Sequence, residues 1–161
     1  VPEHLQQIFI FYLSSIEKKW GRAYLTREFF HLLYEKMRKR MVLIMAYAED
    51  KCVAGTINFK SEDCLYGRYW GCISNYRNLH FELCYYQPIE YAIRHQLKLF
   101  EAGAQGEHKI QRGFLPQITY SAHWLEDKMF YKSVSKFLEE EKQYIQNGIN
   151  EFSPHSPYLI K

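Results

Sequence analysis

"VLIMAYAEDKCVAGTINFKSEDCLYGRYW", residues 42–70, decides the fold, because apolar residues recur there with a period of two. The alternation runs through 42–48, 52–59 and 64–70, and the short polar links EDK and KSED join these runs. Short polar connections between alternating runs are typical of antiparallel hairpins. The stretch therefore predicts an antiparallel meander.

Two amphipathic helices are predicted before the meander. Apolar residues at three- and four-residue spacing indicate a helix over 4–20, which Gly21 ends. Thr26 is suited to cap a second helix over 27–39. This helix finishes in KMRKR, whose cations suit the negative end of the helix dipole, so we interpret the run as a solvated helix end.

A strand, a helix and a strand are predicted after the meander. LHFELC, residues 79–84, alternates like a strand, and Pro88 suits the first turn of the helix that follows. The segment 98–103 then forms a short strand. Strands joined through one helix in so short a stretch are expected to be parallel.

The end of the chain predicts one further strand and a long helix. QITYSAHW, residues 117–124, alternates, and Asp127 caps a helix over 128–147 that closes at Asn147-Gly148. We expect a single domain over 1–150 and an irregular tail over 151–161.

Composition limits the class of protein. The chain has 161 residues, of which 47% are hydrophobic and 24% charged, as in a globular domain. A net charge of +3 is too mild to indicate binding to DNA. No apolar stretch could span a bilayer and no signal peptide opens the chain. The cysteines show no C-x-x-C pair and are interpreted as reduced thiols, which favours a cytoplasmic protein.

Functional groups are unusually dense in EAGAQGEHKIQRGF, residues 101–114. This segment follows a predicted parallel strand, and ligands bind outside the carboxyl ends of such strands. We therefore expect it to line the mouth of a site. The candidate substrate-binding residues in it are Gln105, Glu107, His108, Lys109 and Arg112.

The predicted strand at 79–84 places His80, Glu82 and Cys84 on one face. Polar groups on a central strand are costly unless they are paired or used. One interpretation is a buried hydrogen bond between His80 and Glu82 that fixes the strand. The other is a general base, or an orienter of one, with a pKa raised by burial. Tyr85 follows at the carboxyl end of this strand.

Two further strands carry candidate binding residues. Arg68 and Trp70 share one face of 64–70, either as a wall for a planar or anionic ligand or as an ordinary edge strand with an extended arginine. His123 shares a face of 117–124 with Thr119 and Ser121. No histidine, cysteine or carboxylate spacing matches a standard metal motif, so no metal site is predicted.

Long segments of the chain resemble the FemAB-like family for peptidoglycan biosynthesis or recognition. They are WGRAYLTREFF, LYGRYWG, LHFELCYY, FEAGAQGEHKIQRGFLP and TYSAHW. The resemblance implies a bacterial-type α+β domain with a GNAT-like mixed central sheet flanked by helices. The first strand usual in that fold is absent and the chain begins at Val1, so we expect similarity to the C-terminal half of a longer transferase.

The resemblance also implies a function. Fem transferases move amino acids from aminoacyl-tRNA onto a peptidoglycan precursor, and in this fold an amine attacks an activated acyl group. By position, Glu82 or His80 would be the base. The partners implied are a small-molecule or peptidoglycan-precursor substrate, a tRNA, and either a second copy of the chain or a missing N-terminal half.

The donor is left open by one departure from the GNAT pattern. Acetyl-CoA enzymes usually carry a glycine-rich loop after the fourth strand, whereas Cys84–Ile89 at the predicted place contains no glycine and includes Pro88. Acetyl-CoA is therefore doubtful and aminoacyl-tRNA is an alternative donor. Two other hypotheses stay open, a non-catalytic module that binds a cell-wall peptide or sugar, and a supporting half of a two-half transferase.

Overall fold

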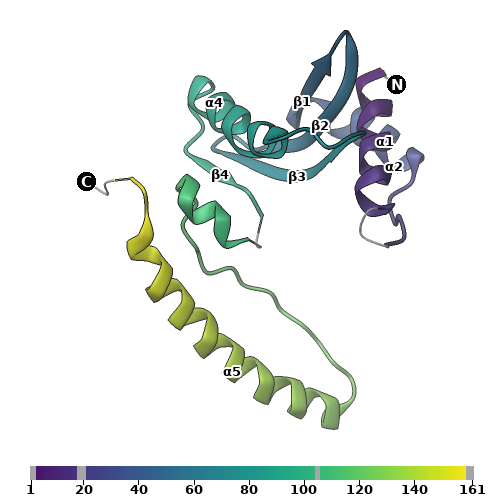
Figure 1. Ribbon diagram of the computed structural model, residues 1–161. Coiled ribbons are helices and arrows are strands. Elements are labelled where there is room, and N and C mark those ends of the chain that lie inside the picture. Colours follow the sequence, from purple (N-terminus) through teal and green to yellow (C-terminus); the bar gives the residue numbers. More distant parts are fainter. Residues whose placement is uncertain (1–2, 18–20, 104–105, 159–161) are drawn as a thin grey trace. The chain divides into compact units, whose positions relative to one another are not determined.

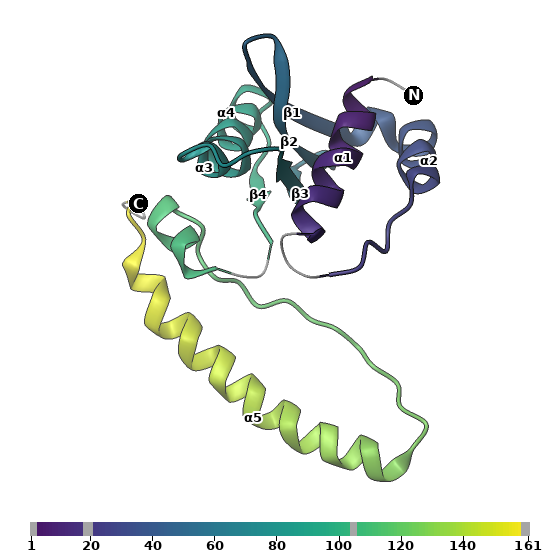
Figure 2. The same ribbon diagram turned by 45° about the vertical axis from the view of Figure 1, so that its right-hand side comes forward.

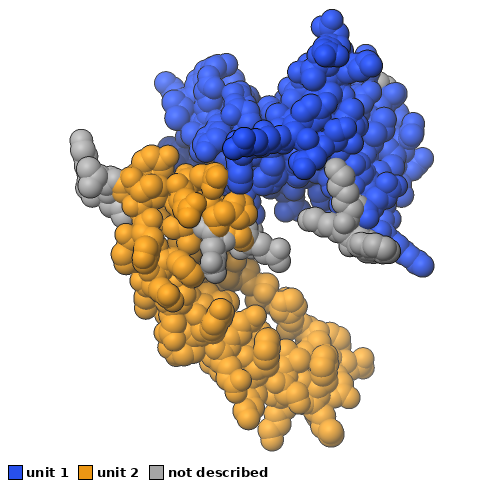
Figure 3. Space-filling model, viewed as in Figure 1, with its two compact units in different colours: residues 1–104 blue, residues 105–161 orange. Residues whose placement is uncertain are grey.

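The computed structural model describes residues 3–17, 21–103 and 106–158. The chain divides into two compact units, residues 1–104 and 105–161 (Figure 3). The single domain expected over 1–150 stays a prediction.

Unit 1 is built on a four-stranded sheet in the order β1-β2-β3-β4 (Figure 1). β1 (Met41–Ala48), β2 (Lys51–Lys60) and β3 (Cys64–Cys72) pair antiparallel. β4 (Leu99–Glu101) pairs parallel with β3. The meander and the strand within 98–103 are confirmed, and the architecture is α+β with a mixed sheet.

Helices cover both faces of this sheet (Figure 2). α1 (Glu3–Glu17) and α2 (Arg27–Met37) lie on one face, where Ile57 of β2 joins the largest apolar cluster. Thr26 caps α2 as predicted, since its hydroxyl accepts from the N–H of Phe29 at 3.3 Å. The opposite face is covered by a continuous helical run of α3 (Leu79–Phe81), η2 (Glu82–Tyr86) and α4 (Gln87–Arg94).

The predicted strand at 79–84 is therefore wrong. Asn78 adopts a left-handed conformation with φ of 63° and the helical run starts at the next residue. η2 within this run is a π-helix, which winds more widely than an α-helix. The parallel partner of β4 is consequently β3, and the helical run is the crossover between them.

The crossover ends in a Schellman motif. The N–H of Leu97 donates to the carbonyl of Ala92 at 2.9 Å, and the N–H of Gln96 donates to the carbonyl of Ile93 at 3.1 Å. Gln96 takes the left-handed position, with φ of 56°, where glycine is usual. The motif fixes the direction in which the chain enters β4.

Replacing Gln96 by glycine is expected to raise the free energy of unfolding by about 0.5–1 kcal/mol, because glycine has no Cβ to strain in this conformation. Urea denaturation followed by circular dichroism measures the change. Gln96→Ala keeps the Cβ and is the control, with no gain expected. An equal gain in both variants would show that the glutamine side chain, and not the backbone, was the source of the strain.

Unit 2 is described by a 3-10 helix, η3 (Glu107–Arg112), an extended irregular segment, the long helix α5 (Lys128–Phe152) and a 3-10 turn, η4 (Ser153–His155). Asp127 caps α5 as predicted and accepts from the N–H of Phe130 at 2.7 Å. The helix does not close at Asn147-Gly148, because Gly148 is helical and α5 continues to Phe152. The predicted strand over 117–124 is absent, and no regular element forms between Phe114 and Leu125.

Candidate functional site

The parallel pairing of β3 with β4 is short, because β4 ends at Glu101 while β3 continues to Cys72. Their register covers only Cys64 to Tyr66 on β3, opposite β4. Just beyond, the pairing of β3 with β2 passes from Gly67 directly to Tyr69, so Arg68 occupies a β-bulge and is exposed. In the described part of the chain, no strand pairs with the outer edge of β3 past Tyr66. Bulges of this kind redirect strands next to functional sites.

Helix α1 contacts the part of this edge that β4 does not reach. The hydroxyl of Ser15 donates to the carbonyl of Trp70 at 2.7 Å, and the hydroxyl of Ser14 donates to the carbonyl of Cys72 at 3.0 Å. The N–H of Ile73 donates to Val53 of β2, so by alternation the groups of Trp70 and Cys72 face away from β2. Backbone N–H groups of β3 therefore line this edge together with the carbonyls.

Three of the predicted site residues lie together beside the end of β3. The His80 ring packs edge-on against Trp70, with centroids 5.0 Å apart, and against Tyr85, with centroids 5.7 Å apart. Phe81 completes this aromatic cluster at 5.5 Å from His80. Tyr85 is buried, whereas Trp70 and His80 are half-buried. The cluster joins β3 to the start of the crossover helix.

Pro88 explains why the helix under this cluster widens. The N–H of Gln87 donates to the carbonyl of Glu82, five residues back, and Pro88 has no N–H to donate. The carbonyl of Leu83 instead accepts from the hydroxyl of Thr56 on β2 at 3.5 Å. The neighbouring buried amide of Asn58 donates to Thr56 at 3.0 Å and to the Val42 carbonyl at 3.3 Å. This polar chain holds the π-helix against the sheet.

Thr56 and Asn58 were missed by the sequence analysis, although a signal existed. They are the only polar residues inside CVAGTINF, and they stand two apart on a strand that is otherwise apolar. Both are almost fully buried. Polar groups so placed require partners, so the pattern indicates a polar contact between layers.

The proposed pairing of His80 with Glu82 on one strand face is wrong. On a helix, residues two apart point in different directions. Glu82 is exposed, and its carboxylate accepts from the side-chain amide of Gln87 at 2.8 Å. Both interpretations of this pair, a buried hydrogen bond and a base with a pKa raised by burial, required a buried Glu82. Glu82 is not buried. Cys84 is half-buried, and no disulfide joins it to another cysteine.

The place of the missing glycine loop also changes. Cys84–Ile89 lies within the helical run and follows no strand, and the segment between β3 and that run is 73–78. ISNYRN at 73–78 contains no glycine either. The nearest glycine, Gly71, lies against the backbone of Phe11 in α1 and serves the packing of that helix.

The structure describes most, but not all, of the candidate site residues of unit 2. Gln105 lies outside the described residues, and only the backbone of Glu107 is described. His108 lies over Gly106, and its carbonyl accepts from a guanidinium nitrogen of Arg112 at 2.7 Å. Lys109 and Arg112 are half-buried in η3. His123 is exposed and lies 3.0 Å from the Ser121 hydroxyl, in the irregular segment that replaces the expected strand.

A tyrosine pair occupies the other face of β3. The hydroxyls of Tyr24 and Tyr69 are 2.6 Å apart. Burial is the main cause that raises the pKa of Tyr69 to about 12, and this hydrogen bond is the second cause. Tyr69 stays neutral at ordinary pH and acts here as a structural hydrogen-bonding group between the loop before α2 and the sheet.

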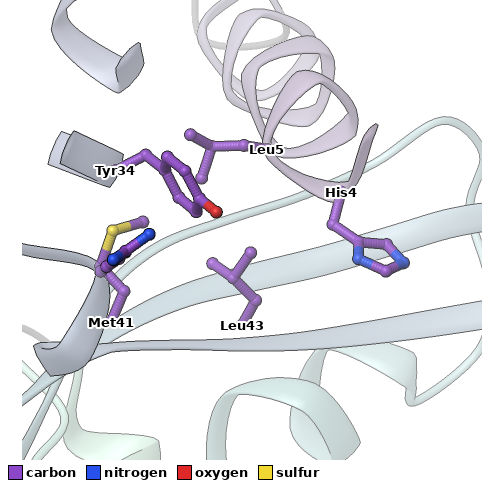
Figure 4. Close-up of a pocket in the computed structure, with 6 residues that line it drawn as sticks. His4, Leu5, Tyr34, Met41 and Leu43 are labelled. Atoms are coloured by element: carbon purple, nitrogen blue, oxygen red, sulfur yellow. The ribbon is translucent and has the colours of Figure 1, made fainter. Parts of the chain in front are cut away.

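A pocket of about 210 Å³ lies on the same side of the sheet (Figure 4). Leu5, Tyr34, Met41 and Leu43 form apolar walls, with His4 and Arg38 completing the lining. None of the predicted site residues contributes to this pocket. Its lining comes from α1, α2, β1 and the turn η1 (Arg38–Arg40).

Neither a metal-ligand cluster nor a membrane-spanning helix is found among the described residues. Among the described residues, no three side chains of histidine, cysteine, aspartate or glutamate gather as metal ligands would. No helix within the described ranges has both the length and the apolar character needed to cross a membrane.

Comparison with known proteins identifies a family. The chain has no match among the curated proteins compared. The model of the FemAB-like family, described as peptidoglycan biosynthesis/recognition, matches residues 1–160. The match covers both units and includes every predicted site residue. The chain belongs to the FemAB-like family of peptidoglycan biosynthesis/recognition proteins.

Proposed function

We propose that the chain is an acyl or aminoacyl transferase of GNAT-like fold that acts on a peptidoglycan precursor. The observation that carries the proposal is the unpaired edge of β3, which begins where β4 ends opposite Tyr66 and contains the Arg68 bulge. In the GNAT-like arrangement, β3 and β4 correspond to the splayed fourth and fifth strands, and the helical run 79–94 to the helix between them. The family places the role of the chain in peptidoglycan biosynthesis or recognition.

The edge of β3 supplies the first catalytic element of this proposal. Backbone N–H groups around Trp70 face away from β2. At this edge they could donate hydrogen bonds to the acyl oxygen, which becomes negatively charged as the tetrahedral intermediate forms. The amine nitrogen attacks the acyl carbon and forms the new amide bond. The leaving group departs with the electrons of the old bond, and a base takes the proton from the amine.

His80 is the residue we propose as that base. Its ring stands beside Trp70 at the end of β3, and an imidazole can accept a proton near neutral pH. Glu82 remains the alternative base because it is close in sequence and its carboxylate is exposed. Arg68 and Tyr85 are proposed to bind the substrate beside the same strand.

The predicted residues of unit 2 are proposed as the substrate clamp. His108, Lys109 and Arg112 lie on η3, which Gly106 and Gly113 bound with positive φ angles. Gln105, Glu107 and His123 keep the same proposed role. An imidazole, an ammonium and a guanidinium on one short helix suit a substrate that carries phosphate or carboxylate groups.

The donor is tested by native mass spectrometry of the full chain with acetyl-CoA and, separately, with aminoacyl-tRNA. We expect no retained acetyl-CoA, because 73–78 has no glycine to bring backbone N–H groups up to a pyrophosphate. A tRNA complex together with transfer of its amino acid would support the proposal. A retained acetyl-CoA adduct would contradict the expected donor, and binding of neither donor would contradict the transferase proposal itself.

One observation favours a recognition module as the second candidate. The carboxylate of Glu82 is engaged by Gln87, while an exposed Arg68 lies two positions from a half-buried Trp70 on β3. An aromatic ring and a cation near each other suit the binding of a cell-wall peptide or sugar. This module would bind a soluble muropeptide without turnover, and Arg68→Ala would weaken the binding more than Glu82→Gln.

A further inference from the structure

β1 forms an exposed edge of the sheet. Its register pairs it with β2 on one side, and no other described strand pairs with it. The N–H of Ile73 donates to Val53, so alternation along β2 turns the backbone groups of Leu43 and Met45 outward, away from β2. MVLIMAYA contains no charged residue and no proline, which are the usual protections of an edge strand.

Opposite charges lie at the two ends of this strand. Arg38-Lys39-Arg40 immediately precedes β1, and Glu49-Asp50 immediately follows it. If a second β1 lay parallel, like charges would meet at both ends. If it lay antiparallel, the cations of each copy would meet the carboxylates of the other, so the sequence around β1 is complementary to itself in the antiparallel direction.

The acidic pair occupies a strained turn. Glu49 and Asp50 link β1 to β2, and both have positive φ angles, 49° and 62°. Asn-Gly is the pair that such a two-residue turn favours. A positive φ at residues other than glycine lowers the stability of the fold. The presence of two acidic residues here in spite of that loss points to a role for their charge.

We propose that β1 joins antiparallel to β1 of a second copy, so that two four-stranded sheets become one continuous sheet. The twofold axis stands perpendicular to the sheet, so each face continues into the same face of the partner. In the register centred on Ile44, Leu43 pairs with the partner's Met45. The cations of η1, just before Met41, then lie at the same end of the strand pair as the partner's Glu49 and the partner's Asp50.

The apolar pocket fits the same arrangement. Two of its walls, Met41 and Leu43, belong to β1, on the face that packs against α1 (Figure 4). In the central register the partner's Met45 and the partner's Tyr47 come to lie beside these two residues on that face. The pocket then receives apolar side chains of the partner, as the centre of an interface does. This inference does not depend on the proposed transferase activity.

Sedimentation velocity of the full chain over a range of concentrations tests the proposal. We expect a dimer. Lys39→Glu and Glu49→Lys should each raise its Kd about tenfold, because each reversal brings like charges together at both ends of the symmetric strand pair. The double variant should return the Kd to within about threefold of the original, because each copy again supplies complementary charges.

Lys132→Glu is the matched control, since it makes the same charge change on an exposed position of α5. Its Kd should be unchanged. A monomer at every concentration would overturn the proposal. A dimer insensitive to Lys39→Glu would also overturn it and would indicate association elsewhere, for example through exposed apolar residues of α5. Failure of the double variant to restore association would exclude the antiparallel pairing.

Discussion

Replacing Gly71 by alanine is expected to lower the free energy of unfolding by about 3 kcal/mol or more. A Cβ at this position would overlap the backbone carbonyl of Phe11 in α1. Backbone cannot rotate away as a side chain can, so α1 would have to move off β3. Phe11 is fully buried in the largest apolar cluster of unit 1. The loss would be a large part of the stability of an ordinary domain.

Gly148→Ala is the matched control for the same chemical change. Gly148 lies in α5, and a Cβ there would meet nothing within 4 Å. Alanine is the better helix former, so this variant should gain up to about 1 kcal/mol. Urea denaturation followed by circular dichroism measures both variants. A Gly71→Ala variant as stable as the original chain would show that α1 does not pack against β3 as closely as described.

The elements of unit 1 that rest on strong local patterns could be predicted from the sequence. The meander is marked by alternation and short polar links, and α2 by Thr26 at its start. The strand β4 was predicted as well, although its parallel partner is β3 and not the segment 79–84. These signals are local and agree with the packing around them, which is the condition under which sequence patterns are reliable.

The error at 79–84 has a physical cause in the π-helix. In a regular α-helix, buried positions recur every three or four residues. Here Leu83 and Tyr85, two residues apart, are both buried because η2 shifts the buried face of the helix. A spacing of two within a short segment imitates a strand. Pro88, which was assigned to a helix start, is where the crossover changes from π to α winding.

The error at 117–124 has a different cause. The segment has the composition of a strand, but a strand requires a partner, and within the described residues of unit 2 none pairs with it. Tyr120 is 91% exposed and Trp124 82% exposed.

The candidate site could be predicted only in part, because contacts between segments distant in the sequence decide it as well. Trp70, His80 and Tyr85 do meet, but through a helix whose contact with β3 no local pattern indicated.

Replacing His80 by alanine is expected to lower kcat about 100-fold or more in the assay with whichever donor supports turnover, if this imidazole takes the proton from the attacking amine. The alanine also leaves a gap between Trp70 and Tyr85, so a loss of activity alone would not separate catalysis from packing. Added imidazole separates the two, because a free base that enters the gap can restore proton transfer but cannot restore a misfolded cluster.

His95→Ala is the matched control on the same helical run. His95 is exposed, stacks on Tyr91 with centroids 4.1 Å apart and lies just after α4, so its loss should leave kcat unchanged. Glu82→Gln should lower kcat less than His80→Ala, because an exposed carboxylate held by Gln87 is the weaker candidate base. If Glu82→Gln is the more damaging change and imidazole restores nothing, the proton passes to Glu82, and His80 only packs against the aromatic rings.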